Sequence, residues 1–315
     1  MFRSRRGFTL VEMLVVLAII AVLVALLMPA VMSAVNNARR AAIGVELAQL
    51  DTAMQSYKTD KGDFPPNLRS YEVFIRHVRK CYPKIDAAHL NRVIQTIWND
   101  TAYSMISPPP ATAVPLLDEG ESLVFWLYLI DQDPRQPFKA ADPTHVPTGT
   151  AAEALLAATS AKRYFPFKED RFVSEDSDQF PAYRALYSKS TCYIHIDSRS
   201  YFYFYEMDYT DPAYAAYADG NYGDGYFVRP YWSEDVANVT TGALKAKNPT
   251  TFQIICAGQD GEFGAAPPTM GAKRFPSGGI TNATYVPATG AGYMPGDRDN
   301  LTNFTEGRRL EDHIP

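Results

Sequence analysis

One uncharged apolar segment near the start of the chain constrains its fold more than any other feature. Residues 13–38 contain no charged side chain, and residues 13–32 are apolar throughout. Twenty helical residues extend about 30 Å, which matches the hydrocarbon core of a bilayer. Arginines lie before the segment, and the next basic residue is Arg39. The positive-inside rule therefore predicts a single-pass helix with a short cytoplasmic N-terminus.

Glu12, at the start of this segment, separates three interpretations. A cleaved secretory signal has an apolar region of only about 7–15 residues, which is shorter than the segment here. A plain membrane anchor fits the length but gives no reason for a carboxylate that costs about 3 kcal/mol to insert. Ionisable residues inside membrane helices usually serve a function, so Glu12 is a candidate functional residue.

The residues around Glu12 resemble a known processing signal. A basic leader, residues 1–7, runs into the sequence Gly7-Phe8-Thr9-Leu10-Val11-Glu12 and then into the apolar helix. This order resembles the prepilin signature of type IV pilins and type II secretion pseudopilins. The resemblance implies that prepilin peptidase removes the leader by cutting between Gly7 and Phe8, and methylates the new amino group of Phe8. Pro29 also lies where these helices usually carry a helix-breaking proline.

Cleavage would give Glu12 a physical role in assembly. The freed amine of Phe8 is a cation at membrane depth, and a filament stacks such helices in a bundle of low dielectric constant. Glu12 of one subunit beside the Phe8 amine of its neighbour would neutralise two charges that are costly to bury unpaired. We therefore expect Glu12 to fix the register between subunits, and Pro29 to kink or loosen the helix.

Beyond the apolar segment, a second pattern continues the helix. Apolar residues recur at spacings of four and three along one stripe of an amphipathic helix. They are Ile43, Leu47, Leu50, Met54 and Tyr57. The sequence predicts one helix over 8–57, about 75 Å long, with a stop at Gly62. Residues 8–35 would form its membrane or filament-core half, and residues 36–57 the half beneath a globular head.

The remaining residues, 58–315, are predicted to form a periplasmic head. Helices are expected in two pieces over 71–105, at 122–130 and near 151–161. Strands are expected at 192–196, 201–205, 226–228 and 252–256. The predicted fold is α+β and pilin-like: the long membrane-spanning helix packs on a C-terminal antiparallel sheet. Residues 68–250 exceed what a compact pseudopilin needs, and we interpret them as a large, mostly helical insertion.

The C-terminal part, residues 251–304, contains a strand followed by two aspartate-rich turns. It resembles the calcium loop of the major type II pseudopilin, although a long Gly/Pro-rich insertion here separates the two turns. Calcium takes about six to eight oxygen ligands from carboxylates and carbonyls. The resemblance nominates Asp260, Asp297 and Asp299 as its carboxylate ligands. The alternative is a pair of turns closed by aspartate side chains without a metal ion.

Other reactive residues have simpler interpretations. His195 and Asp197 share a strand face near Ser198 and Ser200, but no nucleophile elbow or oxyanion loop accompanies them. The five histidines include no zinc-binding spacing. The tyrosines between positions 193 and 231 could form a surface for polysaccharide or a partner protein, but packing in a sheet is the favoured interpretation.

Cysteine content and net charge narrow the function classes. Three cysteines exclude a disulfide-rich scaffold. Cys192 and Cys256 could pair if their strands are neighbours, but buried free thiols are favoured. Without the leader arginines, 27 basic residues stand against 35 acidic ones, a formal charge of −8. This acidic balance argues against nucleic acid as a partner.

The resemblance to pseudopilins implies a structural subunit and not an enzyme: a pseudopilin of a type II secretion-type periplasmic filament that supports protein export. Expected partners are prepilin peptidase, other pseudopilin subunits, membrane lipid, and an inner-membrane assembly platform with its cytoplasmic ATPase. The chain is expected in the inner membrane until it joins the filament. Two alternatives remain: a type IV or competence pilus subunit, and a membrane-tethered binding module or enzyme that uses a prepilin signal.

Overall fold

The fold was analysed in a computed structural model of the chain. The structure describes residues 9–68, 70–110, 115–146, 162–174, 180–189, 191–201, 228, 230–238, 243–263, 274–276, 293 and 295–314.

Helix α1 (Leu10–Lys61) is the longest element and confirms the predicted N-terminal helix. Thr9 caps its start, and Gly62 ends it with a left-handed backbone (φ 86°) that an L side chain rarely adopts. The Gly62 N–H donates to the Lys58 carbonyl at 2.7 Å. The helix therefore runs four residues beyond the predicted end at Tyr57 and stops at the predicted glycine.

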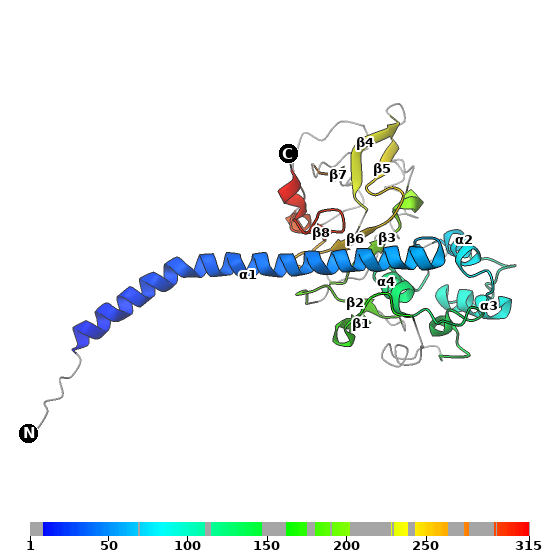
Figure 1. The fold of residues 1–315 in the computed structure, drawn as a ribbon, viewed down its shortest axis with the longest axis horizontal. Coiled ribbons are helices and arrows are strands. Elements are labelled where there is room, and N and C mark those ends of the chain that lie inside the picture. The colour runs from blue at the N-terminus through cyan, green and yellow to red at the C-terminus, as the bar shows by residue number, and fades with distance from the viewer. Residues whose placement is uncertain are drawn as a thin grey trace, which may run out of the picture.

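Three shorter helices follow α1 and lie near its C-terminal end (Figure 1): α2 (Tyr71–Cys81), α3 (Ala87–Ile97) and α4 (Glu119–Tyr128). The chain breaks between α2 and α3 around Pro83, as the sequence predicts, and Asp86 caps α3 by accepting from the Ala88 N–H at 2.7 Å. Helix α3 stops at Ile97. The prediction that the helix continues to residue 105 is therefore wrong. The predicted helix near 151–161 lies outside the described residues.

The strands form three small sheets. β1 (Phe172–Val173) pairs with β2 (Ala182–Tyr183). β6 (Gln253–Cys256) lies between β3 (Ile194–Ile196) and β8 (Leu301–Thr302), antiparallel to both. β4 (Trp232–Asn238) lies between β5 (Ala243–Ala246), which is antiparallel to it, and β7 (Arg274–Phe275), which is parallel.

Two of the predicted strands are confirmed, and two cannot be compared. β3 and β6 lie inside the predicted segments 192–196 and 252–256. Residues 202–205 and 226–227 are outside the described residues, and Tyr201 closes a short 3-10 turn, Ser198–Tyr201. The middle segment is also less helical than expected: within the described part of 68–250, the α-helices end at Tyr128, and strands β1–β5 follow.

The C-terminal half of α1 lies against the head, with β5-β4-β7 on one side in Figure 1 and β1–β2 on the other. The predicted stripe from Ile43 to Tyr57 is fully buried. Helix α4 is buried along its whole length, which confirms the prediction of a core helix for that segment. Trp126 of α4 contacts the ring of Tyr57 and donates to the Pro66 carbonyl at 2.7 Å. The fold is therefore α+β and pilin-like: one long helix carries a mixed head on its second half.

Candidate functional site at the N-terminal helix

The N-terminal half of α1 projects from the head without any covering contact in the described structure (Figure 1). Its large apolar side chains are 42% to 80% exposed, from Val35 at the lower limit to Leu10 at the upper. Exposed apolar surface of this extent marks a membrane or protein interaction site. Within the described residues, α1 is the one helix long and apolar enough to cross a membrane.

The first turn of α1 is closed by a reciprocal pair of hydrogen bonds between Thr9 and Glu12. The Thr9 N–H and hydroxyl each donate to Glu12 Oε2 at 2.8 Å, and the Glu12 N–H donates to Thr9 Oγ1 at 3.3 Å. This capping box satisfies backbone donors that a helix N-terminus leaves open. The spacing Thr-x-x-Glu was visible in the sequence, but the sequence analysis missed this role for Glu12. The Glu12 carboxylate consequently lies over the first turn of α1, beside Thr9, which directly follows Phe8.

The other two predicted features of this helix have different outcomes. The cleavage-site residues Gly7 and Phe8 lie outside the described residues. Pro29 lies inside α1, which continues through it without a break, and Figure 1 shows the helix curving in its N-terminal half. Pro29 has no N–H, so the backbone hydrogen bond from this position to the preceding turn is already missing. The helix can therefore bend here without breaking that bond.

The aspartate-rich turns bring two of the three predicted calcium ligands together. Asp299 Oδ2 accepts from the Gln259 N–H at 2.6 Å and from the Asp260 N–H at 3.3 Å. Asp299 Oδ1 is buried and has no hydrogen-bond partner among the described residues. Burial, together with the charge of Asp299, raises the pKa of Asp260 to about 7. Two close carboxylates with an unsatisfied buried oxygen suit a shared cation.

Asp297 has a separate environment from these two carboxylates. It is buried, and its Oδ1 accepts from the Tyr231 hydroxyl at 3.1 Å. The three aspartates do not form a cluster in which all ligand atoms lie within 4.8 Å. The residues present therefore fit a cation at Asp260 and Asp299, with loop carbonyls as further ligands, but they do not place Asp297 in the same shell.

The aspartate pair lies where the exposed half of α1 ends. The Gln259 side chain donates to the Asn36 carbonyl of α1 at 2.7 Å. At Gly258 (φ 66°), a Cβ would come within 2.4 Å of the Asp299 carbonyl oxygen, so only glycine permits this approach. The loop around Asp260 is therefore bonded to the turn that contains Asp299. It is also bonded to α1, at the boundary between the exposed and the buried half of that helix.

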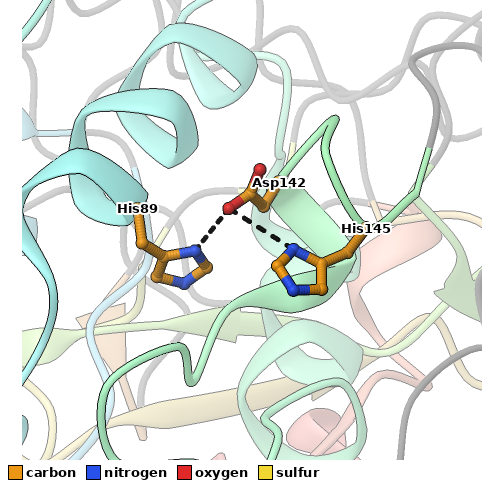
Figure 2. Close-up of side chains that lie close together, drawn as sticks. All are labelled: His89, Asp142 and His145. Carbon is orange, nitrogen blue, oxygen red and sulfur yellow. Dashed lines mark hydrogen bonds and ion pairs between the residues drawn. The ribbon is translucent and has the colours of Figure 1, made fainter.

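A second cluster, absent from the sequence analysis, joins His89, Asp142 and His145 (Figure 2). His89 Nδ1 lies 2.5 Å from Asp142 Oδ2, and His145 Nδ1 lies 3.5 Å from the same oxygen. Arg92 donates to both oxygens of Asp142 at 2.8 Å. Burial would raise the pKa of Asp142, but the hydrogen bonds from Arg92 and Thr144 hold that pKa well below its usual range.

The hydrogen bonds of His89 argue against a metal ion in this cluster. Its Nε2 accepts from the Phe138 N–H at 3.2 Å, so the ring proton is on Nδ1 and is donated to Asp142. A metal ion on Nδ1 would move that proton to Nε2, where it would face the Phe138 N–H. The guanidinium of Arg92 also bonds to both oxygens of the Asp142 carboxylate, which the ion would need as a ligand. The cluster is therefore a structural link between α3 and the loop 131–146.

His195 of β3 and the nearby Asp197 and Ser198 do not form a catalytic hydrogen-bond network. His195 Nδ1 is 3.2 Å from Ser122 Oγ, and burial lowers the pKa of His195 to about 3. Asp197 instead accepts from Arg199 Nε at 2.7 Å. Among the described residues no hydrogen bond joins His195 to Asp197 or Ser198, so a charge-relay geometry is missing there.

The pairing of β3 with β6 decides how the cysteines are placed. Ile194 is opposite Ile255, which puts Cys192 with Ile194 on one face of the sheet and Cys256 with Tyr193 on the other. Neither thiol is in a disulfide bond and both are buried, as favoured from the sequence. Most of the tyrosine-rich segment lies outside the described residues, but Tyr193 and Tyr231 at its ends are buried.

Comparison with known families identifies only the N-terminal segment. Residues 2–28 match the family described as the prokaryotic N-terminal methylation motif. No curated protein and no solved structure matches the chain. The match spans the leader, Gly7, Phe8 and the first part of α1. The chain therefore carries a prepilin-type signal, which implies processing by prepilin peptidase and assembly with pilin-type subunits.

Proposed function

We propose that the chain is a structural subunit, a pseudopilin, of a type II secretion-type periplasmic filament that supports protein export. The observation that carries this proposal is the exposed apolar half of α1 behind a prepilin-type signal. In the inner membrane, lipid covers this surface. In a filament, the same surface packs against the helices of other subunits, and the head remains outside. The contribution of the chain is structural and not catalytic.

Glu12 acts in this proposal as the residue that recognises a neighbour. Its carboxylate lies over the first turn of α1, where the helix dipole favours an anion. Cleavage after Gly7 frees the amine of Phe8, one residue before Thr9, and prepilin peptidase then methylates it. Glu12 of one subunit then pairs with the Phe8 amine of another, and the inner-membrane platform and its ATPase supply the force that moves the subunit out of the bilayer.

The direct test is mass spectrometry of the mature chain together with one variant at Glu12. A first residue other than methylated Phe8 would contradict the proposal. Glu12→Gln keeps the capping box, which accepts glutamine, but removes the charge. We expect this variant to be processed normally and to be absent from filaments. Normal incorporation would show that the charge is not used.

A matched control separates capping from pairing. Thr9→Ala removes the side-chain cap, which costs about 1 kcal/mol of helix stability, but leaves the Glu12 carboxylate. We expect Thr9→Ala to assemble and Glu12→Gln to fail. Immunoelectron microscopy then locates the filament: confinement to the periplasm supports the secretion role, whereas filaments that extend beyond the cell indicate a pilus.

Asp260 and Asp299 would hold a calcium ion that fixes the head to the end of the exposed half-helix. The proposal rests on the orphaned Asp299 Oδ1 and the close Asp260 carboxyl. We expect calcium to raise the thermal unfolding temperature of the full chain in detergent relative to a chelator. Asp299→Asn should abolish this shift, and Glu72→Gln on α2 should keep it. An equal unfolding temperature in calcium and chelator would contradict the site.

A further inference from the structure

The exposed face of α2 carries three basic side chains and one acidic side chain, Glu72, in a head that is acidic overall. Arg76, Arg79 and Lys80 are all exposed and follow the spacing i, i+3 and i+4, which places them on one face of the helix. We call this set the α2 basic face. Lys80 contacts Asp63 at 2.9 Å. Among the described residues, neither Arg76 nor Arg79 has an ion-pair partner.

An acidic turn lies on a different part of the head. Glu169 and Asp170 are exposed and lie in the 3-10 turn Glu169–Arg171 that precedes β1. Their neighbour Arg171 points inward and pairs with Glu46 of α1 at 2.6 Å. The turn formed by Glu169 and Asp170 therefore presents a carboxylate surface beside a neutralised arginine.

The contacts of these two surfaces with α1 fix their positions along its axis. The acidic turn is anchored at Glu46 through Arg171, and α2 is anchored just past the helix end at Asp63 through Lys80. At 1.5 Å per residue the two anchors are about 25 Å apart along α1. Figure 1 shows β1 beside the middle of the head and α2 at its end farthest from the N-terminus.

We propose that the α2 basic face binds the acidic turn of a second copy of this chain, displaced along the direction of α1. The inference rests on the proposed function, because a contact between two copies of this chain matters only if the chain forms a filament. Two copies with heads of net negative charge repel each other, and a contact between the α2 basic face and the acidic turn would bring opposite charges together. Arginine also suits the partner chemistry, since its guanidinium matches a carboxylate with two parallel hydrogen bonds.

A zero-length carbodiimide crosslinker tests the contact in filaments of the wild-type full chain. It joins an amine to a carboxylate only where the two touch. The Lys80–Asp63 adduct within one chain serves as the internal control. We expect adducts of Lys80 with Glu169 or Asp170 in filaments and not in detergent-dispersed subunits, because these groups lie far apart within one chain. Filaments that give the Lys80–Asp63 adduct alone would overturn the contact.

Charge reversal tests whether assembly depends on this pairing. We expect Arg76→Glu/Arg79→Glu and Glu169→Lys/Asp170→Lys each to lower the filament fraction about tenfold at low salt. Combining all four changes in one chain restores opposite charges and should restore filaments. The matched control for the arginine reversal is Lys189→Glu/Arg308→Glu, which makes the same change in net charge at exposed positions elsewhere and should assemble normally.

The outcomes separate this inference from the proposed function. Filaments of both reversal variants at the wild-type level, or no recovery in the fourfold variant, would overturn the contact and leave the filament role intact. Limited proteolysis of each membrane-inserted variant shows whether its head is folded. If the head of a variant is not folded, the crosslink in wild-type filaments decides whether the contact exists. A wild-type chain that forms no filament under any condition would overturn both proposals.

Discussion

The two halves of α1 are one continuous helix with opposite environments. From Leu10 to Val35 the large apolar side chains are exposed, whereas from Ile43 to Tyr57 a single apolar stripe is buried under the head. The first half is apolar on all sides, as a helix that lipid or other helices surround must be. The second half has one apolar face and few charged residues, and two of these, Glu46 and Asp51, bond to the head.

This difference shows which half of the helix the chain itself can stabilise. The buried half makes intramolecular contacts, so changes there should alter the stability of the isolated subunit. The exposed half makes contacts only with its surroundings, so changes there should alter insertion or assembly and leave the head unaffected. Four predictions test this division, and their stability measurements use the full chain in detergent.

The largest effect is expected at the buried ion pair. Glu46 is 9% exposed and accepts from Arg171 Nη1 at 2.6 Å and Nη2 at 2.8 Å. Glu46→Ala leaves the guanidinium buried without its counter-ion, which should lower the free energy of unfolding by about 3–5 kcal/mol. Denaturant titration measures the loss. Gln49→Ala, an exposed change one turn away, should cost little; similar losses for both would contradict the assignment.

Leucine truncation compares the two halves directly. Leu50 is fully buried, and Leu50→Ala should lower the free energy of unfolding by about 2–5 kcal/mol. Leu17 is 62% exposed, and Leu17→Ala should leave the denaturant midpoint of the head unchanged. The same variant should lower the yield of filaments in cells. A shift in the midpoint for Leu17→Ala would mean that the halves are not independent.

Gly44 tests how closely the C-terminal segment approaches the helix. A Cβ at Gly44 would lie 2.8 Å from the Cα of Gly307, so the backbone of one segment must shift. We expect Gly44→Ala to cost about 1–3 kcal/mol although alanine favours helix. Circular dichroism during thermal unfolding measures the cost. Ala41→Ser, an exposed change on the same helix, is the control, and a stabilised Gly44→Ala would refute the close contact.

The smallest effect is a dependence on pH. Burial lowers the pKa of His77, which bonds to the Tyr57 hydroxyl of α1 at 2.9 Å, to about 3. The unfolded chain takes up this proton near pH 6.5, so stability falls as the pH drops below that value. His77→Gln should reduce the fall between pH 6.5 and 5.5 by about 1 kcal/mol. An unchanged pH profile would show that His77 is not buried in neutral form.

Local patterns in the sequence predicted much of the helical structure. The stripe from Ile43 to Tyr57, the stop at Gly62 and the buried helix α4 depend on neighbouring residues, and each is confirmed. The strands β3 and β6 were also predicted, β3 from its alternation. Helix α3 was predicted too long because the apolar pattern continues after Ile97, where the structure instead forms turns.

The candidate site was predictable in part for the same reason. The prepilin-type signal is a contiguous motif, and residues 2–28 match the methylation motif family. The capping box at Thr9 and Glu12 is equally local and could have been recognised from its spacing. The residues nominated for calcium span two turns about forty positions apart, and sequence spacing alone could not show that Asp299 meets Asp260 while Asp297 bonds to Tyr231.

The sequence by itself determined the long helix, its two unlike halves and its processing signal, because periodicity and motifs act between residues a few positions apart. The tertiary structure decided that Arg171 neutralises Glu46, that Cys192 and Cys256 lie on opposite faces, and that Asp142 collects His89 and Arg92. These contacts join residues 50 or more positions apart. Their partners are chosen by packing and strand register, which no local pattern in the chain encodes.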